Sequence, residues 1–202
     1  MSASSRVRVY LACSLDGFIA GPGDDLSFLH EPGPEASEPP APSEALGFDA
    51  FMSQVGAMLM GRRTHDVIAG MGVWGYGDTP VLVATHREIE PAGDSVRAVT
   101  GDIESLITKA KEAAGDKDVY LDGGDLIRQG LDAGLVDELC ITFVPILLGG
   151  EGIRLFDGLS DRTKLEFVEH HRLGHMLQVT ARPTRQVSNP IGQETPVPPR
   201  PQ

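Results

Sequence analysis

Three short segments of the chain combine residue types that bind phosphorylated ligands. Gly61-Arg62-Arg63-Thr64 provides two guanidinium groups and a hydroxyl, and Thr85-His86-Arg87 adds a hydroxyl, an imidazole and a third guanidinium. Guanidinium groups match phosphate oxygens through paired hydrogen bonds, and a threonine can cap a helix. In Asp122-Gly123-Gly124-Asp125, two glycines let the backbone approach an anion at the start of a helix. Together these segments indicate a phosphate or pyrophosphate site.

Each segment also has a plainer interpretation. A single arginine is more often part of a surface ion pair, and a Gly-Gly turn often serves only the backbone. The formal net charge of −12 favours the ligand interpretation for the arginines, because a merely solvated surface would scatter them. The same charge disfavours nucleic acid or an anionic membrane as a partner, since both need a basic surface. We therefore expect a small phosphorylated ligand.

Other polar and aromatic residues are candidates for a substrate side of the site. In segment 14–20, SLDGFIA, the Asp16 carboxylate stands beside a flexible glycine, and we take Asp16, or a water that it orients, as the proton source. Trp74 either caps a substrate pocket by stacking or anchors its glycine-rich loop. We expect no metal site, because the C-terminal histidines lack a matching ligand set, and we expect Cys13 and Cys140 to be buried in the core.

Strands and helices alternate along the chain in a way that would bring these segments together. Runs of β-branched and apolar residues predict buried strands, and a 3.6-residue apolar period predicts helices. Phe48, Phe51, Met52 and Val55 fall on one face of such a helix. The predicted strands are 7–14, 57–60, 81–84, 95–99, 119–121 and 138–143, and the other predicted helices are 64–69, 103–114 and 125–133. Because ligands bind at the carboxyl ends of parallel strands, the candidate segments should share one edge of the sheet.

The predicted elements form one α/β domain over residues 1–182, with a mainly parallel twisted sheet and helices on both faces. Strands 164–171 and 175–182 should close it as an antiparallel hairpin. The proline-rich segment 31–42 is either a surface insertion or an active-site lid, and the proline-rich tail 183–202 should be extended or disordered. No run of about 18 apolar residues occurs, so we expect a cytoplasmic protein without a membrane span.

In their order and spacing, these segments resemble a known family. SLDGFIA, MGRRTHD, ATHR, VYLDGGDLI and DELCITFVPILLGGEGIRLF follow one another as in the dihydrofolate-reductase-like superfamily. The resemblance is greatest to the C-terminal reductase domain of the bacterial bifunctional riboflavin-biosynthesis deaminase/reductase and its stand-alone relatives, and it extends over about residues 7–182. It implies the dihydrofolate-reductase-like three-layer fold.

The resemblance also implies an NADPH-dependent reductase of a small heterocyclic substrate. It assigns the cofactor to Gly61, Arg62, Arg63, Thr64, Thr85, Arg87, Gly123 and Gly124. It places Asp16 and Phe18 near the nicotinamide and Thr142 toward the substrate, so that Asp16 and Thr142 become the candidate catalytic residues. We take Phe18, Phe51 and Trp74 as the substrate-contacting aromatic residues.

The sequence also departs from that family pattern. The tryptophan-containing first loop and the acid-bearing helix of dihydrofolate reductases are missing, which disfavours folate, and the zinc-binding deaminase segments have no counterpart. A non-catalytic nucleotide-binding or regulatory protein on the same fold stays open as an alternative. Relatives of this reductase domain commonly pair through the sheet and the terminal hairpin, and residues 166–171 and 176–181 carry apolar side chains that an edge would expose, so we expect a homodimer.

Overall fold

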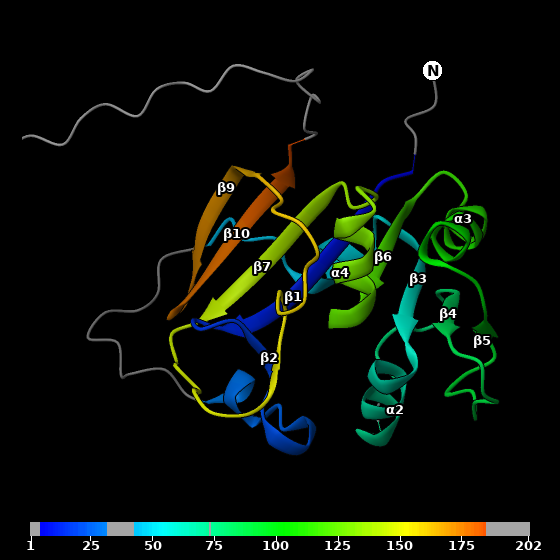
Figure 1. Cartoon of the computed structure of the whole chain (residues 1–202), viewed down its shortest axis with the longest axis horizontal. Coiled ribbons are helices and arrows are strands. Elements are labelled where there is room, and N and C mark those ends of the chain that lie inside the picture. The colour runs from blue at the N-terminus through cyan, green and yellow to red at the C-terminus, as the bar shows by residue number, and fades with distance from the viewer. Residues whose placement is uncertain (1–4, 32–42, 73, 185–202) are drawn as a thin grey trace, which may run out of the picture.

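The computed structural model describes residues 5–31, 43–72 and 74–184, and it has an α/β fold around an eight-stranded sheet (Figure 1). The strand order is β5-β4-β3-β6-β1-β7-β10-β9. Every pair from β5 to β7 is parallel, whereas β10 pairs antiparallel with β7 and β9. The predicted mainly parallel sheet with a C-terminal antiparallel hairpin is therefore confirmed.

The elements agree closely with those predicted from the sequence pattern. The strands of the large sheet are β1 (Val7–Ser14), β3 (Val55–Gly61), β4 (Val81–Ala84), β5 (Val96–Val99), β6 (Asp118–Asp122), β7 (Glu138–Val144), β9 (Leu165–Leu173) and β10 (Met176–Pro183). The helices are α1 (Phe48–Met52), α2 (Arg62–Gly70), α3 (Ile103–Ala114) and α4 (Gly124–Asp132), with short 3₁₀ turns η1 (Pro22–Asp24) and η2 (Ser27–His30). A separate two-stranded sheet pairs β2 (Phe18–Ala20) with β8 (Ile153–Arg154).

Two local expectations need correction. The helix that begins at Phe48 ends at Met52, and Val55, expected on its apolar face, instead opens β3 opposite Asp118. Gly56 allows this because it packs against the Ala114 carbonyl, where a side chain would not fit. The sequence pattern also did not predict β2 and β8, because strands of three and two residues are too short to give a periodic pattern.

Two apolar cores lie on opposite faces of the sheet, because successive residues of a strand point to opposite sides. On one face, Leu59 and Leu121 pack with α3 and α4. On the other, Met58 and Met60 pack with Phe51 of α1 and Tyr120 of β6. The sheet thus forms the middle of three layers. Because both of its faces are covered, its central strands have apolar residues at successive positions of the sequence.

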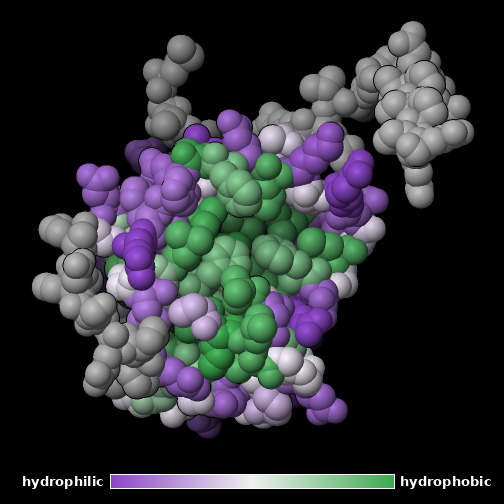
Figure 2. Space-filling view, turned by 90° about the vertical axis from the view of Figure 1, so that its left-hand side faces the viewer, coloured by the Kyte–Doolittle hydropathy of each residue, from purple (hydrophilic) through white to green (hydrophobic). Residues whose placement is uncertain are grey.

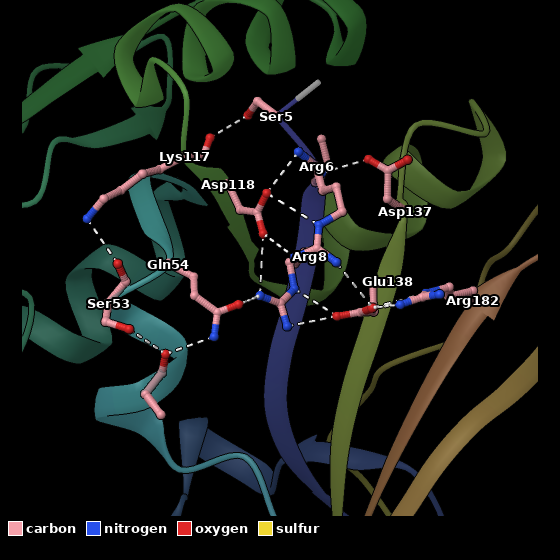
Figure 3. A network of polar contacts seen from close by, with 12 residues as sticks. Ser5, Arg6, Arg8, Ser53, Gln54, Lys117, Asp118, Asp137, Glu138 and Arg182 are labelled. Atoms are coloured by element: carbon pink, nitrogen blue, oxygen red, sulfur yellow. Dashed lines mark hydrogen bonds and ion pairs between the residues drawn. The ribbon is translucent and has the colours of Figure 1, made fainter. Parts of the chain in front are cut away.

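The amino ends of the central strands are joined by charged side chains (Figure 3). Arg8 of β1 is 5% exposed and contacts Glu138 of β7 at 2.8 Å and Asp118 of β6 at 3.4 Å. Arg182 of β10 donates to the second oxygen of Glu138 at 2.9 Å. These ion pairs hold together the edge of the sheet opposite the strand ends that carry the candidate segments.

Two proline-rich parts of the sequence are not among the residues that the structure describes. Residues 32–42 of the proline-rich segment and the tail beyond residue 184 are not among the described residues, so the expectations for a lid and an extended tail stay predictions. Within the described ranges, no helix is both long and apolar enough to cross a membrane.

Candidate active site

A cavity of about 930 Å³ opens at the carboxyl ends of β1, β3, β4 and β6. This is the edge at which parallel α/β sheets bind ligands, because each strand there hands over to a loop or a helix start. The cavity gathers seven of the eight predicted cofactor residues: Gly61, Arg62, Arg63, Thr64, Thr85, Gly123 and Gly124. Arg87 is exposed and is not part of its lining, which contains the neighbouring His86 instead.

The glycine pair lies where two walls of the cavity come close to each other. Gly123 has a φ of +93°, and a Cβ there would lie 2.5 Å from Oγ1 of Thr64. The backbone conformation and this close contact therefore require glycine at position 123 whether or not a ligand binds. Gly124 has no unusual φ, but a Cβ would lie 2.8 Å from Cδ1 of Ile19 and 3.0 Å from a terminal nitrogen of Arg128. The first turn of α4 therefore presents bare backbone to the cavity, as an anion site requires.

The two arginines that begin α2 are engaged with carboxylates. Nε of Arg62 lies 2.7 Å from both carboxylate oxygens of Asp66, and another nitrogen donates to the Glu88 carbonyl at 2.7 Å. Nε of Arg63 donates to Asp24 at 2.7 Å, which joins α2 to η1 across the cavity wall. Both guanidinium groups stay at the cavity, and each would exchange a carboxylate for a phosphate on binding an anionic ligand.

Asp122 is a titratable residue of the cavity lining to which the sequence pattern gave no role. It ends β6, is half-buried, and lines the cavity beside Met60 of β3. Burial raises its pKa to about 6, although hydrogen bonds from the Gly123 N–H, at 2.8 Å, and from Tyr120 oppose the shift. A carboxyl with this pKa can both hold and release a proton near neutral pH. Its place at a strand end, directly before the glycines, was the available signal.

Asp16 proves unsuited to the proton-donor role expected for it. The Ser14 hydroxyl donates to its carboxylate at 2.6 Å, and the backbone N–H groups of Leu148 and Gly149 donate at 3.2 and 2.9 Å. These hydrogen bonds, led by that of Ser14, lower the pKa of Asp16 to about 2. The residue is therefore ionised at neutral pH, and it fastens the first loop to the 145–150 loop without lining the cavity.

The expected substrate aromatics do not line this cavity. Phe51 is fully buried between Tyr10 and Tyr120, with ring centroids 4.6 and 5.1 Å away, so its assignment to the substrate was wrong: it is a core residue. Phe18 is 1% exposed and lies beneath Arg154. Thr142 is 7% exposed in β7 and also lies outside the lining, so its catalytic role stays a prediction.

Trp74 lines a second cavity of about 730 Å³ between α2 and residues 88–92. Its ring meets those of His65 and Tyr76 edge-on, at centroid distances of 6.1 and 5.1 Å. These contacts fit the alternative in which Trp74 anchors its loop, and because Trp74 lies outside the lining of the large cavity, its substrate role stays a prediction. In the described part of the chain, no group of three or more histidine, cysteine or acidic residues is arranged to hold a metal.

Comparison with known proteins gives this arrangement a context. The RibD C-terminal domain matches residues 64–179. A candidate riboflavin biosynthesis protein from Shewanella sp. PV-4 has a similar crystal structure, with a TM-score of 0.75 and 32% identity over 89% of this chain and 99% of that one.

Two more distant structures share the fold. A diaminohydroxyphosphoribosylaminopyrimidine deaminase/5-amino-6-(5-phosphoribosylamino)uracil reductase from Thermotoga maritima matches at a TM-score of 0.62 and 15% identity, over 90% of this chain and 57% of that one. Dihydrofolate reductase from Enterococcus faecalis, complexed with NADP(H), matches at a TM-score of 0.58 and 14% identity, over 91% of this chain and 99% of that one. The dihydrofolate-reductase-like fold is therefore confirmed. Since the matched domain covers more than half of the 202 residues, the chain belongs to the RibD C-terminal domain family.

Proposed function

We propose that this protein is an NADPH-dependent reductase of a small heterocyclic substrate. The dinucleotide would lie along the strand ends, with its pyrophosphate at the first turn of α4 and its 2′-phosphate near Arg62 and Arg63. Gly123 and Gly124 leave the backbone at the start of α4 without side chains, and the two arginines lie in the same cavity lining, so these residues fit such a group. The enzyme from Enterococcus faecalis, which binds NADP(H), supports this choice of cofactor.

The observation that carries the proposal is the position of Asp122 in the same cavity as these phosphate-binding elements. When bound, a reduced nicotinamide supplies a hydride to a carbon of the substrate. The nitrogen or oxygen of the reduced C=N or C=O bond must then gain a proton. Asp122, with its pKa near 6, is the group that would donate it. The apolar side chains of Leu26, Leu29 and Ile68 in the same lining would limit water around the reacting atoms.

The names of two structural relatives support a choice of substrate class. The Thermotoga maritima protein is a 5-amino-6-(5-phosphoribosylamino)uracil reductase, and the Shewanella protein is a candidate riboflavin biosynthesis protein. We therefore propose a uracil- or pterin-like heterocycle, of which that uracil derivative is the first to test. A carboxyl group such as Asp122 also pairs readily with the N–H groups of such rings.

Two measurements test the proposal. Calorimetric titration should give tighter binding of NADPH than of NADH, because the arginines recognise the 2′-phosphate. Loss of nicotinamide absorbance should then follow addition of the uracil derivative, and not of dihydrofolate. Equal affinity for both cofactors would contradict the cofactor assignment, while tight NADPH binding without turnover of any heterocycle would favour the non-catalytic alternative.

A further inference from the structure

Arg154, on the short strand β8, is a fourth arginine of the large cavity and differs from the other three. Arg62 and Arg63 pair with carboxylates, and Arg128 donates to the carbonyls of Arg154 and Leu155. For the Arg154 guanidinium, by contrast, the described residues provide neither a carboxylate nor a carbonyl as acceptor, and its Nε is buried without a hydrogen bond.

The side chain of Arg154 is held against an aromatic ring. Its guanidinium carbon lies 4.4 Å from the ring centroid of Phe18, its cross-strand partner in β2. Phe18 is itself 1% exposed, and a Cβ on Gly152 would lie 2.8 Å from its ring, so the ring has little room to move. Stacking on a fixed ring restricts a guanidinium group and leaves its outer N–H groups available to a ligand.

The backbone around Arg154 is equally constrained. Arg128 of α4 donates to the Arg154 carbonyl at 3.2 Å, and the N–H of Leu155 donates to the Gly17 carbonyl at 2.9 Å. The side chains of Arg128 and Ile19 both reach the space beside Gly124, so β8 and β2 adjoin the first turn of α4. Arg154 and the start of α4 are therefore neighbouring parts of one cavity wall.

A buried N–H without an acceptor is unfavourable, and it calls for an explanation in a native structure. The cavity lining also contains Asp24, Asp122, Asp125 and Asp157, which would repel an anion. A cation that stacks on Phe18 but has no carboxylate partner among the described residues, close to a helix start, offsets that repulsion. We infer that Arg154 binds a phosphate group of the ligand next to the first turn of α4.

This inference rests on the proposed binding of a phosphorylated cofactor, and two sources of the phosphate are chemically equivalent. One is the pyrophosphate of the dinucleotide, and the other is the phosphate of a phosphoribosyl substrate. Inorganic pyrophosphate and ribose 5-phosphate serve as separate probes for them. Ribose 5-phosphate is titrated in the presence of saturating NADPH, so that it cannot occupy the cofactor's own phosphate site.

The test uses calorimetric titration of the full chain and three variants. Arg154→Gln removes the charge, and Arg154→Lys keeps the charge but loses the planar fork and the stacking. The matched control is Arg97→Gln, an exposed arginine on β5 that lies outside the cavity lining. Thermal melting of each variant verifies that it is folded, because the side chain of Arg154 also covers Phe18.

We expect Arg154→Gln to weaken the binding of one phosphate probe, the one that represents the phosphate bound by Arg154, by about 10- to 100-fold. Arg154→Lys should weaken this binding less, and Arg97→Gln should leave it unchanged. Weaker NADPH and pyrophosphate binding would assign Arg154 to the cofactor, and weaker ribose 5-phosphate binding alone would assign it to the substrate. Folded Arg154→Gln protein that binds all three probes like the parent would overturn the inference and leave the proposed function intact. If the parent chain binds pyrophosphate through Arg154 but not NADPH, the proposed function fails and the inference stands.

Discussion

At the scale of single residues, Asp122 and Asp16 show how the same functional group acquires opposite properties. Both are aspartates at the end of a strand or just beyond it, near the same edge of the sheet. Asp16 accepts hydrogen bonds from Ser14 and two backbone N–H groups, which stabilise its charge. Asp122 is half-buried in the same strand as Tyr120, and the burial penalises the charged form. At neutral pH the first is therefore an ionised carboxylate, whereas the raised pKa of the second is what our proposal of a proton donor requires.

Replacing Asp122 with asparagine should separate binding from chemistry. Asp122→Asn keeps the shape of the side chain but cannot donate a carboxyl proton, so NADPH affinity should stay within about threefold while turnover falls about 10²-fold or more. In the parent protein, kcat/KM should decrease as the pH rises through about 6, because the protonated carboxyl is the donor. Steady-state kinetics across pH 5 to 8 check both points. Unchanged turnover in Asp122→Asn would remove Asp122 from the mechanism.

The same substitution should also stabilise the fold at neutral pH. The folded-state pKa of Asp122, about 6, lies above the value of about 3.9 in an unfolded chain, so the folded protein binds its proton more tightly. The resulting stabilisation is complete below about pH 4 and is lost as the pH rises through about 6. At pH 7, Asp122→Asn should therefore raise the free energy of unfolding by about 1 to 3 kcal/mol.

Urea unfolding at pH 4 and pH 7 measures this effect. Asp125→Asn is the matched control, because its carboxyl is exposed in the first turn of α4 and should give no comparable difference between the two pH values. A gain in stability that is as large at pH 4 as at pH 7 would contradict the explanation by desolvation.

At the scale of elements, the start of helix α4 and the carboxyl ends of β1, β3, β4 and β6 form the walls of the cavity. The two glycines at the start of α4 fulfil different needs: Gly123 has a positive φ of +93°, while Gly124, the first residue of the helix, lets the ends of the Ile19 and Arg128 side chains pack close to the backbone. The opposite ends of β1, β6 and β7 are tied by Arg8, Asp118 and Glu138. The carboxyl-terminal halves of β1 and β6 thus border the cavity, whereas their amino ends, together with that of β7, contribute to stability.

Substitutions at the two glycines should have different effects. Gly123→Ala should lower the free energy of unfolding by about 1 to 3 kcal/mol, because of its φ of +93° and the contact with Thr64. Gly124→Val should cost less stability, since the atoms it meets are the ends of the flexible Ile19 and Arg128 side chains, but it should abolish NADPH binding. Melting temperature and NADPH affinity are measured on the same samples. A folded Gly124→Val that binds NADPH normally would refute the pyrophosphate site.

Breaking the charged cluster at the other end should destabilise the fold without affecting the ligand. Glu138→Gln leaves the buried Arg8 guanidinium without its closest carboxylate, and removal of one partner of a buried pair costs about 3 to 5 kcal/mol. Glu166→Gln, an exposed position on β9, is the control and should cost nothing measurable. Chemical denaturation provides the comparison. If Glu138→Gln were as stable as Glu166→Gln, the ion pairs of Glu138 with Arg8 and Arg182 would contribute nothing measurable to stability.

At the scale of the whole molecule, the hairpin of β9 and β10 leaves apolar side chains exposed at one end of the sheet. Figure 2 shows apolar residues gathered on this side of the molecule and surrounded by hydrophilic ones. Phe167 is 75% exposed and Leu177 45%, with Leu165 and Val168 nearby on β9. Contiguous apolar surface at an unpaired sheet edge commonly marks an interface, and a second copy of the chain is the partner we propose.

The expected homodimer can be disrupted at this surface. Phe167→Lys should convert a dimer into a monomer, because an isologous interface would bury the new charge twice. Glu112→Lys, exposed on α3 at the other end of the sheet, should leave the dimer intact (Figure 1). Light scattering across micromolar concentrations gives the mass of each variant. A monomeric parent protein would exclude the dimer, and a dimeric Phe167→Lys would locate the interface elsewhere.

The sequence by itself determined the sheet, its hairpin and most of the residues that we assign to phosphate binding. Strands such as Val7–Ser14 and helices such as Ile103–Ala114 depend on local periodicity, and glycine and arginine at strand ends keep that position in any parallel sheet. The seven predicted cofactor residues therefore meet in one cavity.

Only the tertiary structure decided which acid can carry a proton, which arginine lacks a partner and which aromatic rings are core. The pKa of Asp122 depends on burial, and its cross-strand neighbour Met60 lies on the adjacent strand β3, about 60 residues away in the sequence. The role of Arg154 depends on pairing between β2 and β8, more than 130 residues apart. Burial, desolvation and cross-strand contacts arise between segments that no local pattern connects, so these properties appear only once the chain is folded.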